Sequence, residues 1–339
     1  MPTLKDVAQL AGVSVTTVSI VLNGKAQERK IPMSTCAKIE GAMRTLNYQP
    51  NIAARRLRKN EQAKPIVALY WPIDHRTHTL AFMINQIQTE IKRRNFSCEF
   101  IIQTYESDHL DKDADAIING DYNAVIIGGL SSKDLDFLQS VPLQIFVVLI
   151  NRYLEKCSTI MVNNTKIGDI AVKLFMQKDY RQIGLIASRN TYLASSQRTS
   201  GFLNACASQG LKVPEEWRLY TENTMEGGVL VAQRFMQLPN KPKAIFCDSD
   251  LIAIGMIHHF NRCGLRIPND LEIISVGSML DNTYTTYSTP SISTIALPHD
   301  DIASTAISLT IDSLAFNSIK PQHISIDPDL FLRESFQLD

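Results

Sequence analysis

The sequence predicts a small all-α head at the N-terminus, followed by an α/β body of two subdomains. Three observations support this fold class. Two short segments with helical spacing of apolar residues meet at Gly12. A polar segment that ends in proline, residues 59–65, marks a domain boundary. From residue 66 onward, short apolar segments alternate with longer helical ones, which is the pattern of parallel sheets covered by helices on both faces.

The head begins with the segment LKDVAQLAGVSVTTVSIVLNG, residues 4–24. A first helix should end near Ala11, and Gly12 can take the positive φ that a tight interhelical turn needs. Ser14 should cap a second helix, Val15–Leu22, by accepting a hydrogen bond from its first turn. Two helices joined this tightly form a helix-turn-helix, whose second helix enters the major groove of DNA. On spacing alone, an ordinary helical hairpin is the alternative.

The second helix should have one buried face and one outer face. We expect Val18 and either Val21 or Leu22 to be buried. The outer face then consists of Val15, Thr16, Ser19 and Ile20. A third helix should follow at about residues 34–46, with Ser34 as its cap.

Charge is concentrated in the head, although the net charge of the whole chain is zero. Residues 1–60 hold ten Lys or Arg against three Asp or Glu, which leaves +7. The remaining residues hold 24 basic against 31 acidic side chains, which leaves −7. We therefore expect only the head to meet phosphate.

A short segment after the head, residues 50–58 (PNIAARRLR), could form one more helix. Pro50 suits a first helical turn, and Asn51–Leu57 would then form about two turns. A helix this short is marginal alone in water. The segment is therefore either a solvated linker or a hinge that folds only when it meets DNA and a second copy of itself.

The body should contain eight strands and seven helices. The predicted strands are 66–71, 98–103, 124–128, 145–150, 159–162, 183–187, 244–247 and 273–276. The predicted helices are 80–94, 132–140, 165–177, 196–209, 226–237, 250–263 and 299–316. A body of this length is long for one doubly wound sheet, so we expect two sheets. A small molecule would bind in a cleft between them, beyond the carboxyl ends of the strands.

Several other classes of protein are disfavoured. The six cysteines form no CxxC pair and no metal-ligand spacing, so we expect the reduced thiols of a cytoplasmic protein. No signal-peptide core or membrane-spanning apolar run is present, which argues against a transporter's solute-binding protein. No Ser/His/Asp set, metal cluster or phosphate-binding loop is discernible. We therefore expect no enzyme, no catalytic residues, no metal and no cofactor.

Seven motifs give the whole chain a resemblance to the LacI/GalR family of transcriptional regulators. They are LKDVA (4–8), GVSVTTVS (12–19), NYQPNIAARRL (47–57), RTSGF (198–202), FCDSDLIAIG (246–255), GLRIPND (264–270) and TPSISTI (289–295). The family implies a body like a type I periplasmic binding protein, with three crossovers between two similar subdomains. The implied divisions are a helix-turn-helix head at 1–49, a hinge helix and linker at 50–63, and an effector-binding and dimerisation body at 64–339. Subdomain 1 would comprise 64–162 plus 294–321, and subdomain 2 would comprise 163–293 plus 322–339.

By this resemblance, the recognition helix reads bases with Val15, Thr16 and Ile20. Valine and isoleucine cannot make the bidentate contacts of Arg, Asn or Gln, but they can contact a thymine methyl group. The alternative for Ile20 is a place in the core. The expected phosphate contacts are Ser14, Thr17, Ser19 and Asn23.

The resemblance extends DNA contact to the hinge, at Tyr48, Asn51, Ala54, Leu57 and Arg58. Leu57 matches the leucine that wedges into the minor groove at the centre of the operator, and Arg58 matches a basic residue beside it. Two hinges are needed, so we expect a homodimer on a near-palindromic operator. The chain lacks a leucine-heptad tail, which argues against a tetramer.

In the effector cleft, Arg198 matches the family's effector-binding arginine, with a surface salt bridge as the alternative. Relatives carry an aspartate where this chain has Met279 or Leu280, and Asp281 is displaced from that place. With Arg152 as a second positive group, the cleft would suit a phosphorylated sugar or another anion.

Two further cleft residues have open roles. Trp71 would either stack on a sugar or belong to the core. Asp250 borders the cleft and could instead cap the helix at 250–263. The other expected effector contacts are Asp74, His78, Asn223 and Ser249.

We therefore expect a sequence-specific DNA-binding regulator, in the first place a repressor. A sugar, sugar derivative or phosphorylated sugar would control its operator affinity. The alternative is a corepressor-dependent or activating regulator with a non-sugar effector.

Overall fold

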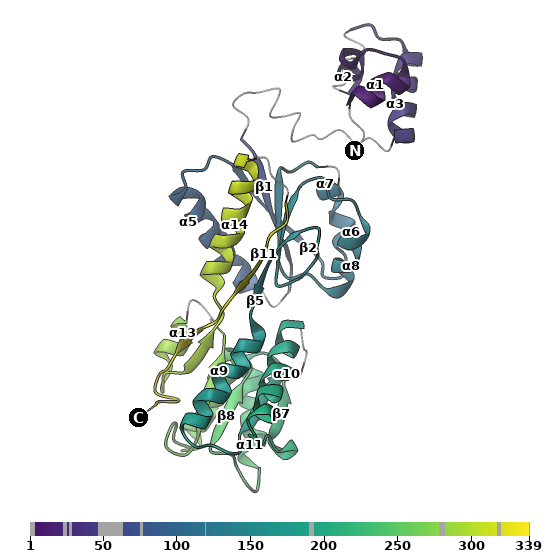
Figure 1. The fold of residues 1–339 in the computed structure, drawn as a ribbon. Helices are drawn as coiled ribbons and strands as arrows, with labels where there is room; N and C mark the ends of the chain where they lie inside the picture. The colour runs from purple at the N-terminus through teal and green to yellow at the C-terminus, as the bar shows by residue number, and fades with distance from the viewer. Residues whose placement is uncertain are drawn as a thin grey trace.

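The computed structural model describes residues 4–22, 26, 29–46, 64–74, 77–118, 120–189, 193–277, 282–316 and 320–338. Within these ranges, a three-helix head precedes an α/β body that contains two sheets (Figure 1). The predicted hinge helix, residues 51–57, lies outside the described residues.

The head consists of α1 (Leu4–Ala11), α2 (Val15–Leu22) and α3 (Met33–Leu46). The chain bends by 105° between α1 and α2, as in a helix-turn-helix. Gly12 has a φ of +67°, and the Ser14 Oγ accepts a hydrogen bond from the Thr17 N–H at 3.0 Å. Both predictions for this turn are confirmed. The third helix begins at Met33, so Ser34 lies in its first turn and not at its cap.

The three helices share one small core. Its buried side chains are Val7, Ala8, Ala11, Val18, Ile39 and Ala42. Val18 is fully buried, as predicted, and both Val21 and Leu22 are partly buried against the same core. The inner face of α2 therefore packs against the core of the head.

The first sheet has six parallel strands in the order β11-β5-β4-β3-β1-β2. The strands are β1 (Ile66–Pro72), β2 (Glu99–Tyr105), β3 (Ala124–Ile127), β4 (Phe146–Ile150), β5 (Ser158–Val162) and β11 (His323–Ile326). Its helices are α5 (Thr77–Arg93), α6 (Leu110–Asp113), α7 (Asp115–Ile118), α8 (Ser132–Ser140) and α14 (His299–Phe316). In β1, Val67 and Leu69 pack on the α5 and α14 side, whereas Ala68 and Tyr70 pack on the side of α6, α7 and α8 (Figure 1).

The second sheet has the order β12-β10-β9-β8-β6-β7, and its one antiparallel pair is β10 with β12. The strands are β6 (Gly184–Ser188), β7 (Arg218–Thr221), β8 (Ala244–Cys247), β9 (Glu272–Val276), β10 (Ser293–Ala296) and β12 (Asp329–Phe331). The helices are α9 (Asn164–Gln177), α10 (Leu193–Ser208), η1 (Glu215–Trp217), α11 (Met225–Met236), α12 (Asp250–Arg262) and α13 (Thr283–Tyr287). Gly168 lets α9 approach α10 closely, because a Cβ there would lie 2.6 Å from the Phe202 nitrogen.

Strand pairing corrects the expected division of the body at two places. The expectation assigns 294–321 to subdomain 1 and 322–339 to subdomain 2. Instead, β10 extends the second sheet beside β9, and β11 completes the first sheet beside β5. The chain therefore changes sheets after β5, after β10 and after β11. The side chains of β11 alternate between exposed and half-buried, so no apolar run marks this strand in the sequence.

These connections set the direction in which each sheet points. Val162 ends β5, and the chain passes at once into α9 of the second subdomain. The carboxyl edge of the first sheet therefore faces the second subdomain. The chain leaves the carboxyl end of β10 at Ala296 and enters α14 on the first sheet. The carboxyl edge of the second sheet therefore faces the first subdomain (Figure 1).

Candidate DNA-binding face and effector-binding residues

The outer face of α2 is accessible, as a base-reading surface requires. Val15 is 41% exposed and Thr16 is exposed. Ile20 is half-buried, yet it is absent from the apolar side chains that pack on the core of the head. Ile20 therefore differs from Val18, which is part of that core, and the interpretation of Ile20 as a core residue is disfavoured.

The predicted phosphate contacts begin at the cap of α2. The Ser14 Oγ accepts from the Thr17 N–H and lies 2.8 Å from the Thr17 Oγ1. Ser14 therefore has a structural role as a cap, independent of any contact with phosphate. Ser19 is half-buried on the same helix.

Several predicted site residues cannot be placed. The residues that lie outside the described ranges are Asn23, Tyr48, Asn51, Ala54, Leu57, Arg58 and Asp281. The side chain of His78 is also outside them. Their assignments remain predictions from the sequence.

Arg198 lies in α10, the helix that follows the carboxyl end of β6. Its Nη1 donates to the Asp248 carbonyl at 3.2 Å, and its Nε donates to the Asn164 Oδ1 at 3.3 Å. No ion pair of Arg198 occurs among the described residues, which disfavours a surface salt bridge. Burial lowers the pKa of Arg198, while the charges of Asp248 and Asp250 raise it.

Asp248 is a residue of this site that the sequence analysis misses. It follows β8 directly and is 1% exposed. Its Oδ2 accepts from both the N–H and the hydroxyl of Ser188, each at 2.9 Å, whereas its Oδ1 has no hydrogen-bond partner among the described residues. Burial raises the pKa of Asp248, and the Ser188 hydrogen bonds and the Arg198 charge lower it. Its signal in the sequence is its place in the motif FCDSDLIAIG, directly after an apolar strand.

Asn223 and Ser249 meet beside this acid. The Ser249 hydroxyl donates to the Asn223 Oδ1 at 2.5 Å. Ser249 also occupies the N-cap position of α12, which corrects the prediction that Asp250 caps this helix. The Asp250 carboxylate instead lies against the backbone of Gly277, where a Cβ would come within 2.4 Å of the Asp250 Cγ.

In the first subdomain, Trp71 belongs to the core. It is 4% exposed, and its ring covers Gly128 so closely that a Cβ there would lie 2.1 Å from it. This arrangement disfavours stacking of the ring face on a sugar. The Trp71 Nε1 has no hydrogen-bond partner among the described residues.

The other predicted residues of the first subdomain follow β1 and β4. Arg152 is buried and donates from Nη1 to the Asn151 carbonyl at 2.7 Å. Asp74 is half-buried just beyond β1. Both therefore lie at the sheet edge that faces the second subdomain.

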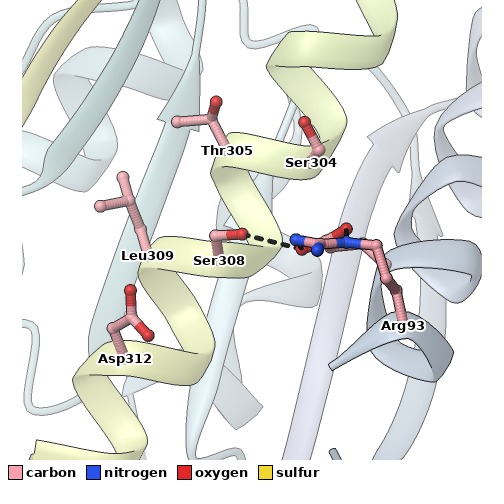
Figure 2. Close-up of a pocket in the computed structure, with 7 residues that line it drawn as sticks. Arg93, Ser304, Thr305, Ser308, Leu309 and Asp312 are labelled. Atoms are coloured by element: carbon pink, nitrogen blue, oxygen red, sulfur yellow. Dashed lines mark hydrogen bonds and ion pairs between the residues drawn. The ribbon is translucent and has the colours of Figure 1, made fainter. Parts of the chain in front are cut away.

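Two grooves among the described residues are lined by other side chains. One, of about 390 Å³, runs between α5 and α14, where Ser308 donates to the Glu90 carboxylate at 3.3 Å (Figure 2). Glu90 also binds Arg93 through two hydrogen bonds of 2.6 and 2.7 Å. The other, of about 600 Å³, follows α9 and α10. Neither groove is lined by a predicted effector residue.

The described residues also bear on other classes of protein. They contain no group of three or more His, Cys, Asp or Glu side chains that could hold a metal ion. No single described helix is long and apolar enough to cross a membrane, and α1 with α2 passes that test only as a sharply bent pair.

Two family models match the chain. The model of bacterial regulatory proteins of the lacI family matches residues 3–51, and that of a periplasmic binding protein-like domain matches residues 172–336. The crystal structure of a LacI family transcription regulator from Clostridium acetobutylicum is 34% identical, with a TM-score of 0.75. The match covers 80% of this chain and 100% of that one.

Two curated relatives match almost end to end. The probable HTH-type transcriptional repressor ExuR of Bacillus subtilis (strain 168) is 28% identical. The HTH-type transcriptional repressor PurR of Mannheimia succiniciproducens is 27% identical. Each match covers 99% of this chain and 98% of the relative.

Proposed function

The chain belongs to the lacI family of bacterial regulatory proteins, and from this premise we propose that it is a transcriptional repressor without catalytic activity. It acts in the cytoplasm as a homodimer on a near-palindromic operator. A small molecule bound between the two subdomains controls its affinity for that operator.

The geometry of the head carries the DNA-binding part of this proposal. The cap at Ser14 and the turn at Gly12 hold α2 so that Val18 faces the core and Val15 and Thr16 face outward. A recognition helix needs this separation, because its outer side chains must reach base edges while its inner ones fix the fold. The apolar outer face suits contact with thymine methyl groups.

We assign the rest of the specificity to the hinge segment. Leu57 of each protomer would insert between base pairs of the minor groove and kink the operator. Unstacking a base step costs about a few kcal/mol, which added contacts offset. This role also explains why the protein would act as a dimer, since one wedge from each chain is needed at the centre of a symmetric site.

The effector is proposed to be a sugar or a sugar derivative, with phosphorylated sugars included. Arg198, Asn223, Ser249 and Asp250 would contact it from the second subdomain, and Asp74 and Arg152 from the first. Five of these residues follow the carboxyl ends of strands in two sheets that point toward each other, and Arg198 lies in the helix after β6. Ligands of open α/β sheets bind at such edges. Effector binding would shift operator affinity by about 1–3 kcal/mol.

The test of DNA binding starts from a random DNA library, from which the full-length protein selects its own operator. We expect a near-palindromic consensus and a footprint with two-fold symmetry. Leu57→Ala should fold normally but lose operator affinity in a gel-shift assay. Leu338→Ala, at a partly exposed leucine of the body, is the control. A Leu57→Ala protein that bound the operator as tightly as the wild type would reject the role of the hinge.

A further inference from the structure

The groove of about 600 Å³ along α9 and α10 has a polar lining that the proposed function does not use. The two helices pack side by side on the second sheet (Figure 1). Four Ser or Thr hydroxyls line the groove, together with the carboxamides of Asn163, Asn164, Gln197 and Asn204. Asp169 is the only charged residue among the described ones that line it. The groove therefore offers many hydrogen-bonding groups and a single negative charge.

This lining suits the backbone of a peptide. A carboxamide both donates and accepts hydrogen bonds, as a hydroxyl does. A peptide unit is itself an amide, so it can pair with a side-chain carboxamide through one donor and one acceptor. Small-molecule pockets are instead lined mainly by apolar and aromatic side chains. No aromatic side chain of the described residues lines this groove, which also disfavours a nucleobase, since bases stack on aromatic rings.

The dimensions of the groove fit an extended segment. Gln197 and Ser208 both line it, and they lie at opposite ends of α10. At 1.5 Å per helical residue, the distance along the helix is about 16 Å. An extended chain advances about 3.3 Å per residue, so the groove accommodates about five residues. Gly201 and Ala205, between the two ends, are small enough for another backbone to approach closely.

Two lining residues have side chains available for a partner. Asn204 and Asp169 are both exposed, and neither side chain forms a hydrogen bond or an ion pair with another described residue. Asn204 can therefore offer its whole carboxamide to a peptide unit. Asp169 favours a segment that carries a Lys or Arg side chain, because no cation among the described residues lines the groove.

One end of the groove is connected to Arg198. Asn164 is 7% exposed, and its Nδ2 donates to the Gln197 Oε1 at 3.4 Å. Its Oδ1 accepts from the Arg198 Nε at 3.3 Å. A peptide amide that donates to Gln197 competes with Asn164 for the same oxygen. Occupation of the groove therefore changes the surroundings of Arg198 without direct contact.

We propose that this groove docks an extended segment of another protein, about five residues long, with a basic side chain that meets Asp169. The backbone of the segment pairs with the carboxamides of Asn204 and Gln197. Through Asn164, the docked segment acts on Arg198. The docking itself depends on neither the operator nor the effector of the proposed function.

The test selects ligands from a phage-displayed library of random heptapeptides on the full-length protein, without DNA. Enriched peptides are synthesised, and their affinities are measured by fluorescence polarisation. We expect peptides with one basic residue. Replacing that residue with glutamine should weaken binding to the wild type but not to Asp169→Asn. Maltohexaose, measured by calorimetry, represents a carbohydrate occupant. Failure to enrich any peptide, or binding of maltohexaose in the groove, would overturn the inference.

A matched pair of variants locates the bound peptide. Asn204→Ala removes an exposed carboxamide of the groove and should weaken peptide binding about tenfold, the equivalent of one lost hydrogen bond. Asn269→Ala, at an exposed asparagine outside the groove, should bind like the wild type. Equal affinities in the two variants would overturn the inference. A change of sedimenting mass in Asn204→Ala would also overturn it, because the groove would then be a contact between copies of the chain.

Isotope labelling of arginine for NMR tests the connection to Arg198. The Arg198 Nε–H signal is identified by its absence from Arg198→Lys. Saturating peptide should shift this signal in the wild type, and a bound peptide that left it unchanged would overturn the link through Asn164. None of these measurements uses operator DNA or an effector, so their failure would leave the proposed function standing.

Discussion

The Asn163 Nδ2 donates a hydrogen bond to the Asp327 Oδ1 at 3.1 Å, and this bond ties the first crossover between the subdomains to the last. Lys166, in the first turn of α9, forms an ion pair with the other oxygen of the same carboxylate. The backbone N–H of Asn163 donates to the Ile326 carbonyl at 2.9 Å. One carboxylate thus bridges two of the three segments that connect the subdomains.

Removing this tie should weaken communication between effector and DNA more than it weakens the fold. Exposed ion pairs contribute little to stability, so Asp327→Ala should leave the Tm nearly unchanged. The ratio of operator affinities with and without effector should fall by about threefold or more, as for other substitutions along a coupling network. The control is Asp329→Asn, at an exposed acid of β12. An unchanged ratio in Asp327→Ala would mean that the tie does not transmit the signal.

The same carboxylate predicts a pH dependence. The hydrogen bond from Lys166 is the largest effect that holds the pKa of Asp327 below its usual value. A carboxyl whose pKa is lower in the folded state stabilises the fold above its unfolded pKa, about 4, and this contribution is lost as the pH falls. The pKa of Asp327 in an NMR titration should therefore lie below its usual value, and the small difference in Tm between the wild type and Asp327→Asn should be largest near pH 7 and shrink toward pH 3. A difference that stayed constant over this range would contradict the ion pair.

Two glycines of the head should respond to alanine in opposite directions. Gly12 has a φ of +67° and Gly41 lies inside α3, and a Cβ would meet no atom within 4 Å at either position. Gly12→Ala should destabilise the head by about 1–2 kcal/mol, because an L side chain disfavours the left-handed region. Gly41→Ala should stabilise it by about 0.5–1 kcal/mol. Thermal unfolding followed by helical circular dichroism checks both, and equal shifts would contradict the turn geometry.

Ser14 allows its two roles to be separated. Ser14→Ala removes the cap of α2 and should destabilise the head by about 1 kcal/mol. Ser14→Asp keeps an acceptor for the Thr17 N–H, so the head should stay folded, but the added charge should repel a phosphate at this position. We therefore expect Ser14→Asp to lose operator affinity while retaining its helical signal. Retention of full affinity in a gel-shift assay would limit Ser14 to the role of a cap.

Most of the body could be predicted because buried parallel strands are continuous apolar runs. The predicted strand 145–150 and helix 299–316 match β4 and α14 within one residue. The strand β10 could not be found in this way, since its Ser293 and Thr294 are polar yet fully buried. The Ser293 hydroxyl donates to the Phe336 carbonyl at 2.7 Å and accepts from the Arg333 N–H at 2.7 Å. These partners lie some forty residues away in the sequence.

The residues of the candidate effector site also differ in how far the sequence alone could identify them. Arg198 could be identified because it belongs to a contiguous motif, RTSGF. Asp248 also lies in a contiguous motif, FCDSDLIAIG, but its role could not be recognised there, because an acid after a short apolar strand is also typical of an exposed turn. Only the pairing of β6 with β8 places Ser188 beside it and explains how the carboxylate can be buried. Residues whose role depends on a neighbouring strand require the fold before they can be recognised.

Gly277 offers a test of Asp250 that leaves the effector residues themselves unchanged. Gly277 has a φ of +148°, and a Cβ there would lie 2.4 Å from the Asp250 Cγ, so alanine must displace this carboxylate. Gly264 also has a positive φ, +74°, but its Cβ would meet nothing within 4 Å. Both alanine variants should therefore lower the Tm through backbone strain. Only Gly277→Ala should also weaken binding of an effector identified by thermal shift, by about tenfold. Isothermal titration calorimetry separates the two effects, and equal affinities in the two variants would remove Asp250 from the effector site.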